Sequence, residues 1–216
     1  ALAYQRTLKY ERVTRQQAEQ AFHKLLFLEN FPDWEEPVIV SGKAFQDYMM
    51  HFILDYANKR RLTIQFHTGL QEGNGNYIEY SDPTLLGNLF LAYKQVDFDL
   101  FHIGYPFQHM VGALAKTFPN VYIDMCWAHI ISPQACMQAL NEWIDCVPVN
   151  KITAFGGDYK IIDAVYGHQY LARRDVAMVL ARKVEEGLFD VKEAKRIAKL
   201  LFYDNPYRLF KLEGKL

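Results

Sequence analysis

Residues 62–77, LTIQFHTGLQEGNGNY, run from a short β-rich segment into a histidine and then into a glycine-rich loop. Segment 61–66 is mainly apolar without clean polar alternation, which is typical of a strand that is covered on both faces. Similar segments follow at 96–103, 120–127 and 150–157. The sequence therefore predicts four short buried strands, with His67 at the end of the first.

Helical periodicity fills the intervals between these segments. Apolar residues recur at helical spacing in 82–95, 106–118 and 132–147, with a proline near the start of each. Two further helices are expected at 170–189 and 190–210, the second ending near Asn205 and Pro206. Because alternating strands and helices return the chain to the same sheet edge, the pattern predicts an α/β fold with a parallel sheet.

The first sixty residues are predicted to be helical. Thr14 and Gln17 have the spacing of a capping box at the start of 14–31, and Ser41 is expected to cap a second helix over 42–61. We therefore expect a helical segment over 1–60 and one compact α/β unit over 61–216.

Composition argues against several classes of partner and location. The net charge is −1, and basic residues are mixed with acidic ones, which disfavours nucleic acid and anionic membranes as partners. No apolar run reaches the roughly 20 residues that span a bilayer, and no signal peptide is recognised, so a cytoplasmic protein is expected. The three cysteines fit neither a disulfide framework nor a CxxC pair, and we interpret them as buried free thiols.

Polar residues follow the predicted strands where each strand ends: His67, His102, Asp124 and Asp158. The loops after parallel strands form the active face of α/β folds, and two imidazoles with one carboxylate suit zinc. Spacing alone leaves a structural role open for each histidine. Asp124 is expected to cap or shape its loop, and the other histidines, including His129 and His168, are assigned surface or packing roles unless they face the same site.

The motifs IQFHTG, FHIGYP, YIDMCW and FGGDY, in this order, resemble the C-terminal half of the amidohydrolase superfamily, in the amidohydrolase-2 branch of metal-dependent (β/α)8 barrels. The resemblance covers roughly residues 60–210. It implies a TIM barrel of which this chain supplies about the last four βα units. It also implies that His67, His102 and Asp158 bind a divalent metal, most simply zinc, with Asp158 and His102 catalytic.

The same resemblance implies a range of activities. The branch contains hydrolases, nonoxidative decarboxylases and uronate isomerases, and DAVYGHQYLARR at 163–174 is similar to the last of these. Arg173 or Arg174 would then hold a substrate carboxylate, although solvent-facing helix positions are the favoured explanation of both. We expect a hydrolase acting on a small polar, carboxylated substrate through a metal-activated water, with the loop 69–77 shaping the pocket.

The sequence departs from the family pattern in one respect. The family's first strand ends in a metal-binding His-x-His pair, and this sequence contains none. A full barrel needs about 250 residues. We therefore expect a partner that completes the barrel, either an N-terminal half in the same or a separate chain or a second copy, and a non-catalytic fragment or subunit is the alternative. A nucleotide-binding domain is disfavoured because no GxGxxG or GxxxxGK[ST] follows a strand.

Overall fold

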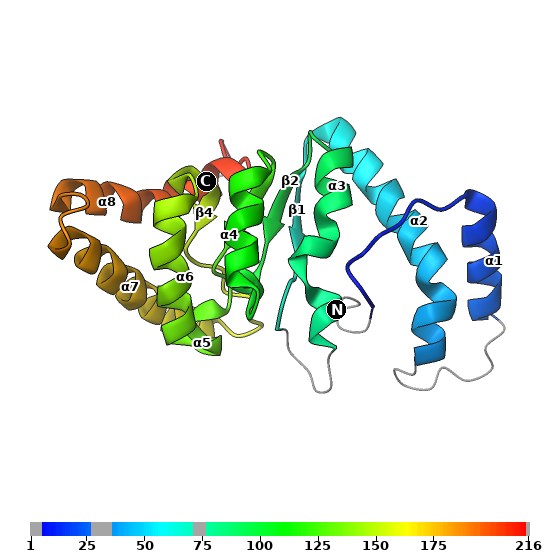
Figure 1. Cartoon of the computed structure of the whole chain (residues 1–216), viewed down its shortest axis with the longest axis horizontal. Helices are drawn as coiled ribbons and strands as arrows, with labels where there is room; N and C mark the ends of the chain where they lie inside the picture. The colour runs from blue at the N-terminus through cyan, green and yellow to red at the C-terminus, as the bar shows by residue number, and fades with distance from the viewer. Residues whose placement is uncertain (1–5, 27–35, 71–76, 215–216) are drawn as a thin grey trace.

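The computed structural model describes residues 6–26, 36–70 and 77–214, and its centre is a four-stranded parallel sheet (Figure 1). The strands are adjacent in chain order, and the predicted parallel arrangement is confirmed. Their bounds are β1 (Thr63–Phe66), β2 (Asp97–Leu100), β3 (Val121–Asp124) and β4 (Ile152–Thr153). Among the described strands, β1 and β4 each have a neighbour on one side only, so the sheet has two edges.

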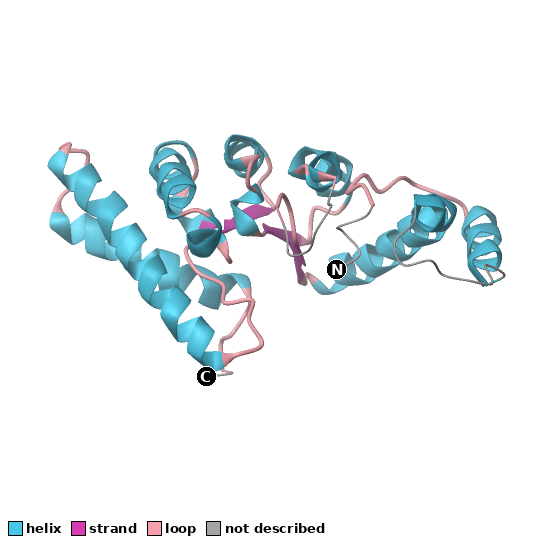
Figure 2. Ribbon diagram, turned by 90° about the horizontal axis from the view of Figure 1, so that it is seen from below, coloured by secondary structure: helices cyan, strands magenta, loops and turns pink. Residues whose placement is uncertain are grey.

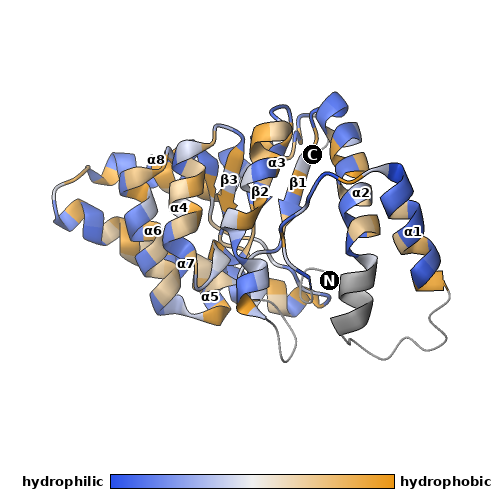
Figure 3. Ribbon diagram, turned by 45° about the vertical axis from the view of Figure 1, so that its right-hand side comes forward, coloured by the Kyte–Doolittle hydropathy of each residue, from blue (hydrophilic) through white to orange (hydrophobic). Residues whose placement is uncertain are grey.

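Helices cover one face of this sheet and form an arc around the strands (Figure 2). Those between successive strands are α3 (Gly87–Ala92), α4 (Gln108–Thr117), α5 (Ala128–Ile131) and α6 (Pro133–Cys146). Short strands with helices on their outer side form part of a (β/α)8 barrel, which confirms the predicted fold class. The helices are amphipathic, and hydrophobic and hydrophilic residues alternate along α4, α6 and α7 in Figure 3.

Side-chain alternation along the strands separates an apolar face from a polar one. Phe98, Leu100 and Ile123 are fully buried in the hydrophobic core beneath the helices. On the other face, the Gln65 amide donates to Asp99 across 3.2 Å. Because alternate strand residues point to opposite faces, the polar set lies on what would be the interior of a closed barrel.

The N-terminal helices form a hairpin ahead of β1, at the far side of the molecule from α8 (Figure 1). The capping box of α1 (Arg15–Leu26) is confirmed: the Gln17 amide N–H donates to Thr14 Oγ1 at 3.2 Å, and the Thr14 N–H donates to Gln17 Oε1 at 2.8 Å. The predicted start of the second helix at Ser41 is wrong, because α2 spans Glu36–Arg60. Its second residue is Pro37, which the first turn of a helix accommodates.

Three other predicted helix limits are also wrong. Residues 82–95 form a 3₁₀ turn (Pro83–Leu86) followed by the short α3, because the Asp82 side chain caps Thr84 and tightens the first turn. Helix α7 spans Ile162–Glu185 and begins eight residues before the predicted start. The expected stop near Asn205 also fails, because α8 (Val191–Lys199) continues through a π-helical turn (Leu200–Asp204) into α9 (Asn205–Leu209), whose first turn holds Pro206.

The length of the helices and the burial of the cysteines can also be read from the structure. In the described ranges, none of the helices combines the length and apolar character required to cross a bilayer. Cys126 and Cys136 are buried free thiols, as expected, whereas Cys146 is only partly buried.

Candidate metal centre

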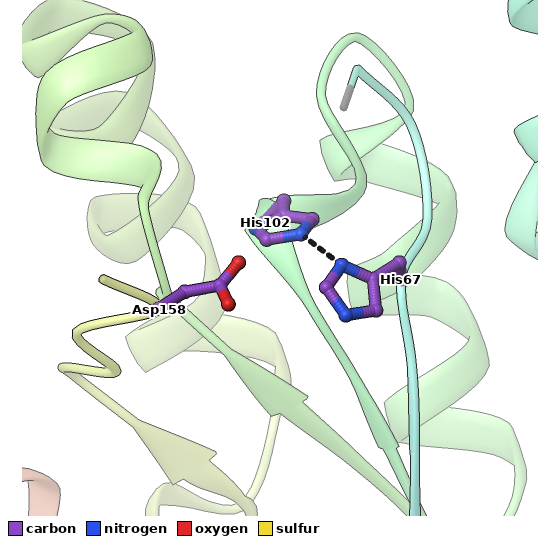
Figure 4. Close-up of side chains that lie close together, drawn as sticks. All are labelled: His67, His102 and Asp158. Atoms are coloured by element: carbon purple, nitrogen blue, oxygen red, sulfur yellow. Dashed lines mark hydrogen bonds between the residues drawn. The ribbon is translucent and has the colours of Figure 1, made fainter. Parts of the chain in front are cut away.

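The three residues predicted to bind metal meet at the carboxyl ends of the strands (Figure 4). His67 directly follows β1, His102 follows β2, and Asp158 lies in the segment after β4. Their candidate ligand atoms all lie within 4.8 Å of one another, and this is the one such group of three or more in the described part of the chain. The parallel sheet therefore brings together residues that lie 91 positions apart in the sequence.

A nitrogen of each imidazole lies close to the other ring, and a backbone carbonyl holds the His102 ring in place. His67 Nδ1 lies 2.8 Å from His102 Nε2, and His102 Nδ1 lies 3.0 Å from the Cys126 carbonyl oxygen. A carbonyl oxygen only accepts, so Nδ1 of His102 carries the hydrogen. Its Nε2 then has a lone pair, which accepts the hydrogen of His67 Nδ1 in this structure and is the atom that would bind a metal.

Burial keeps both imidazoles neutral. It lowers the pKa of His102 to about 4, despite the opposing effects of the Cys126 carbonyl and Asp158. Burial also lowers the pKa of His67, again against the opposing charge of Asp158. Two neutral imidazoles beside an exposed carboxylate form a donor set that fits zinc, and a bound ion would take the place of the hydrogen bond between the two rings.

Asp124 ends β3 and shapes the loop that follows it. Its carboxylate accepts from the Cys126 backbone N–H and from Thr153 Oγ1, the latter at 2.8 Å. Burial raises the pKa of Asp124 to about 6, although these hydrogen bonds act in the opposite direction. Asp124 therefore holds the turn that presents the Cys126 carbonyl to His102, in agreement with its predicted role as a loop former.

Two glycines allow the chain to deliver Asp158. A Cβ on Gly156 would lie 2.8 Å from Cys126 Cβ, and a Cβ on Gly157 would lie 3.3 Å from Val165 on α7. The Gly–Gly pair thus fits between the end of β3 and helix α7, where a side chain at 156 would clash with Cys126 and one at 157 would crowd Val165. Asp158 itself has a φ of +50°, which is uncommon outside glycine.

Positive φ angles recur after all four strands. Besides Asp158, they occur at Gly69 after β1 (+67°), at His102 after β2 (+66°) and at Trp127 after β3 (+62°). Backbone strain of this kind costs roughly 1–3 kcal/mol per non-glycine residue and concentrates at functional sites. The strained positions include two of the three candidate ligands. The sequence predicted these residues as candidate ligands but carried no signal for the strain or for Trp127.

The predicted substrate-binding residues lie elsewhere in the fold. Arg173 and Arg174 are on exposed positions of α7, and the Arg174 guanidinium donates to the buried Asp175 at 2.7 and 2.9 Å. Neither arginine bonds to the three candidate ligands in the described ranges. Most of the loop predicted to shape the pocket, residues 71–76, lies outside the described residues.

Two further histidines lie behind the segment that carries Asp158. His129 on α5 is fully buried, and its ring nitrogens lie 3.0 Å from the Ala154 carbonyl and 3.1 Å from Asp175. His168 on α7 is 2% exposed, and neither of its ring nitrogens has a hydrogen-bond partner among the described residues. Both residues are buried, in agreement with the expected packing roles, and both support β4 and the segment that follows it.

Comparison with known proteins identifies the family to which this chain belongs. Residues 36–212 match the family model described as Amidohydrolase. The protein fluG of Emericella nidulans is 26% identical over 179 residues, which are 80% of this chain and 21% of that protein. A uronate isomerase of Thermotoga petrophila is 27% identical over 100 residues, which are 46% of this chain and 22% of that protein.

Among solved structures, a protein assigned as a metal-dependent hydrolase of Lactobacillus casei superimposes with a TM-score of 0.81 at 23% identity. The match covers 99% of this chain and 54% of that one, so the likeness shows a shared fold over about half of that chain. The chain spans about a fifth of the length of the two curated relatives. The family match covers most of this sequence, and the chain therefore belongs to the amidohydrolase family.

Proposed function

We propose that this chain supplies the metal-binding carboxyl-terminal half of a metal-dependent hydrolase that acts on a small polar, carboxylated substrate. The observation that carries the proposal is the convergence of His67, His102 and Asp158, whose ligand atoms lie within 4.8 Å of one another at the carboxyl ends of three strands. Family membership adds that this edge of the sheet is where such enzymes hold their metal.

The donor set favours zinc among the divalent metals. Imidazole nitrogens and a carboxylate oxygen are common zinc ligands, and three protein ligands leave a coordination position open, as in catalytic zinc sites. A zinc ion held there would lower the pKa of a bound water to about 7 and polarise a substrate carbonyl.

The protein's own groups would then have distinct roles. Asp158 is the exposed member of the set, so its carboxylate can take a proton from the attacking water and deliver it to the leaving group. His102 is held by the Cys126 carbonyl, which fixes the direction of its Nε2. Arg173, Arg174 and the loop 69–77 remain predictions for substrate binding.

A second candidate function is a subunit that becomes active only when another half-barrel completes it. At β4 the edge of the sheet is bonded to the C-terminal segment, where the Ala154 N–H donates to the Leu201 carbonyl and the Asn205 amide donates to the Ile152 carbonyl. Among the described strands, β1 has a neighbour on one side only, and the inner face of the sheet carries buried polar residues such as Asp99. Parallel edges of this kind pair readily with further strands. The completing strands would come from the same polypeptide, from a separate chain or from a second copy.

A third candidate is isomerase or decarboxylase chemistry at the same centre. It is supported by the uronate isomerase of T. petrophila, which matches over 100 residues. In isomerisation Asp158 would move a proton between atoms of the substrate. In decarboxylation it would deliver a proton to the carbon whose bond to the released CO₂ breaks, and neither reaction consumes water.

Zinc titration with chelator competition tests the metal centre directly. We expect the wild-type chain to bind zinc and Asp158→Ala to bind it much more weakly. Asp163→Ala, at an exposed carboxylate at the start of α7, is the matched control and should bind like wild type. Equal zinc affinity in wild type and Asp158→Ala would contradict the proposed centre.

A further inference from the structure

The segment that carries Asp158 is clamped between two layers. On one side is Cys126, which limits the space at Gly156. The backbone N–H of Trp127 lies on the same side and donates to the Gly156 carbonyl, with 3.4 Å between nitrogen and oxygen. On the other side is helix α7, where Val165 packs against Gly157. Because the clamp sets the backbone of 156–158, it also sets the direction of the Asp158 carboxylate.

His168 is a polar side chain of this clamp. It follows Val165 by three positions, so both project from the same face of α7. Its ring lies edge-on to Tyr159, the neighbour of Asp158, with the centroids 5.6 Å apart, and it also contacts Phe155 at 5.1 Å. The ring is thus in contact with both ends of the segment 155–159.

The imidazole has a hydrogen to donate and no bonded acceptor. Burial lowers the pKa of His168 to about 4, with the nearby Gly157 carbonyl acting in the opposite direction, so the ring is neutral at pH 7 and carries one N–H. Neither nitrogen meets the geometry of a hydrogen bond with any described residue. An unpaired buried donor costs roughly 1–3 kcal/mol, which a small movement toward Gly157 would recover.

His129 illustrates the arrangement in its completed form. Its Nε2 lies 3.0 Å from the Ala154 carbonyl, and its Nδ1 lies 3.1 Å from Asp175, so it anchors the start of the same segment. The rings of His129 and His168 are also in edge contact, at 5.7 Å. Two histidines behind β4 therefore lie next to two carbonyls, those of Ala154 and Gly157, in the segment that leads to Asp158.

We propose that His168 is a positioning residue for Asp158: its ring N–H donates to the Gly157 carbonyl when the carboxylate engages the metal, and this bond fixes the ligand's direction. The inference rests on the proposed metal centre. It assigns His168 no contact with metal or substrate.

The test compares His168→Phe, which keeps an aromatic ring and removes both nitrogens, with wild type in zinc titrations at pH 7.5. We expect about tenfold weaker zinc binding, the lower end of the range for groups that orient a ligand. Restoration by His168→Asn or His168→Gln, which return an N–H donor, would support the proposal. An unchanged zinc affinity in a folded His168→Phe protein would overturn it.

His51→Phe provides the matched control. His51 is also buried, with an unpartnered Nε2, but it lies on α2 and bonds Tyr93 at 2.7 Å, away from the centre. We expect this substitution to lower stability without changing zinc affinity. Equal losses of affinity in the two variants would show a general effect of buried histidines and would overturn the proposal.

Hydrogen exchange of residues 154–160 in wild type and His168→Phe, each measured with and without zinc, separates failure of this inference from failure of the metal centre. Wild type that binds no zinc and whose exchange zinc does not slow removes the proposed function, and the inference with it. Slower exchange on zinc binding in wild type, with less slowing in His168→Phe, supports the positioning role, whereas equal slowing in the two proteins overturns that role alone.

Discussion

Among the described residues, His67 lies next to His102 and His129 lies next to His168, and the atoms around these two pairs of rings differ. At the strand ends, His67 and His102 direct ring nitrogens at each other and toward an exposed carboxylate. Behind β4, His129 directs both nitrogens at fixed protein acceptors, and Asp175 is held in turn by Arg174. Identical side chains are thus placed as candidate metal ligands in one part of the fold and as structural support in the other, and the partner atoms make the difference.

The largest difference in zinc affinity should appear when one histidine of each pair is replaced by alanine. His102→Ala should weaken zinc binding by at least about 100-fold, beyond the roughly 10–100-fold cost of altering an outer-shell group. His129→Ala should retain far more affinity, because its nitrogens already have protein partners. Chelator competition measures both. If His129→Ala lost as much affinity as His102→Ala, the contrast between the two pairs would disappear.

The free energy of unfolding should depend more on the buried His129 than on a surface histidine. His129→Phe leaves Asp175 without one of its partners in a buried position, so the free energy of unfolding should fall by about 3 kcal/mol. His109→Ala, at a surface pair in which His109 is 71% exposed, should change it by less than about 0.5 kcal/mol. Urea denaturation of both variants provides the measurement, and similar losses would show that burial of His129 carries no special weight.

The pH dependence of stability should show that the His168 ring is buried in its neutral form. An unfolded histidine has a pKa of about 6.5, and burial lowers the pKa of His168 to about 4 in the folded chain. The unfolded state therefore binds the proton first as the pH falls, and this group's contribution to stability is lost between pH 6.5 and 4. His168→Phe removes that loss, so it should lose about 2 kcal/mol less than wild type between pH 7.5 and 4.5.

The comparison with wild type is needed because other groups titrate in the same range. Burial raises the pKa of Asp124 to about 6, which stabilises the fold as the pH falls, but this effect is common to both proteins. Urea denaturation at the two pH values gives the difference. Parallel pH profiles for wild type and His168→Phe would contradict the assigned burial of a neutral imidazole.

The smallest effect concerns the two neighbouring arginines on α7. Arg174→Ala should lower the free energy of unfolding by about 0.5–1 kcal/mol, because it removes a half-exposed partner of the buried Asp175. Arg173→Ala should change it by less than about 0.5 kcal/mol, since Arg173 is exposed. The reverse ranking, measured by urea denaturation, would mean that Arg174 is not part of the support behind β4.

The sequence predicted the parallel sheet and the candidate ligands because both depend on local patterns. Buried strands without polar alternation leave a readable run of apolar residues, and a histidine such as His67 directly after the run must lie at the sheet edge. Helix limits were less predictable. Prolines at 37 and 206 act as first-turn residues in this fold, and a sequence alone does not distinguish that position from a helix end.

The support around the centre could not be read from the sequence. The bond from His102 to the Cys126 carbonyl joins a side chain to a backbone atom 24 positions away, and it depends on the turn that Asp124 holds. The unpaired imidazole of His168 likewise depends on how α7 packs against Gly157. Such contacts follow from tertiary packing, which leaves no periodic signal.

Native mass spectrometry of the freshly isolated protein, recording chain masses and bound metal in one spectrum, tests the central claim most directly. We predict about one zinc ion per centre, carried by a complex in which further chain mass completes the barrel or by this chain at its own mass. A bare 216-residue chain that takes up no zinc even when zinc is added would contradict the claim that His67, His102 and Asp158 form a metal centre.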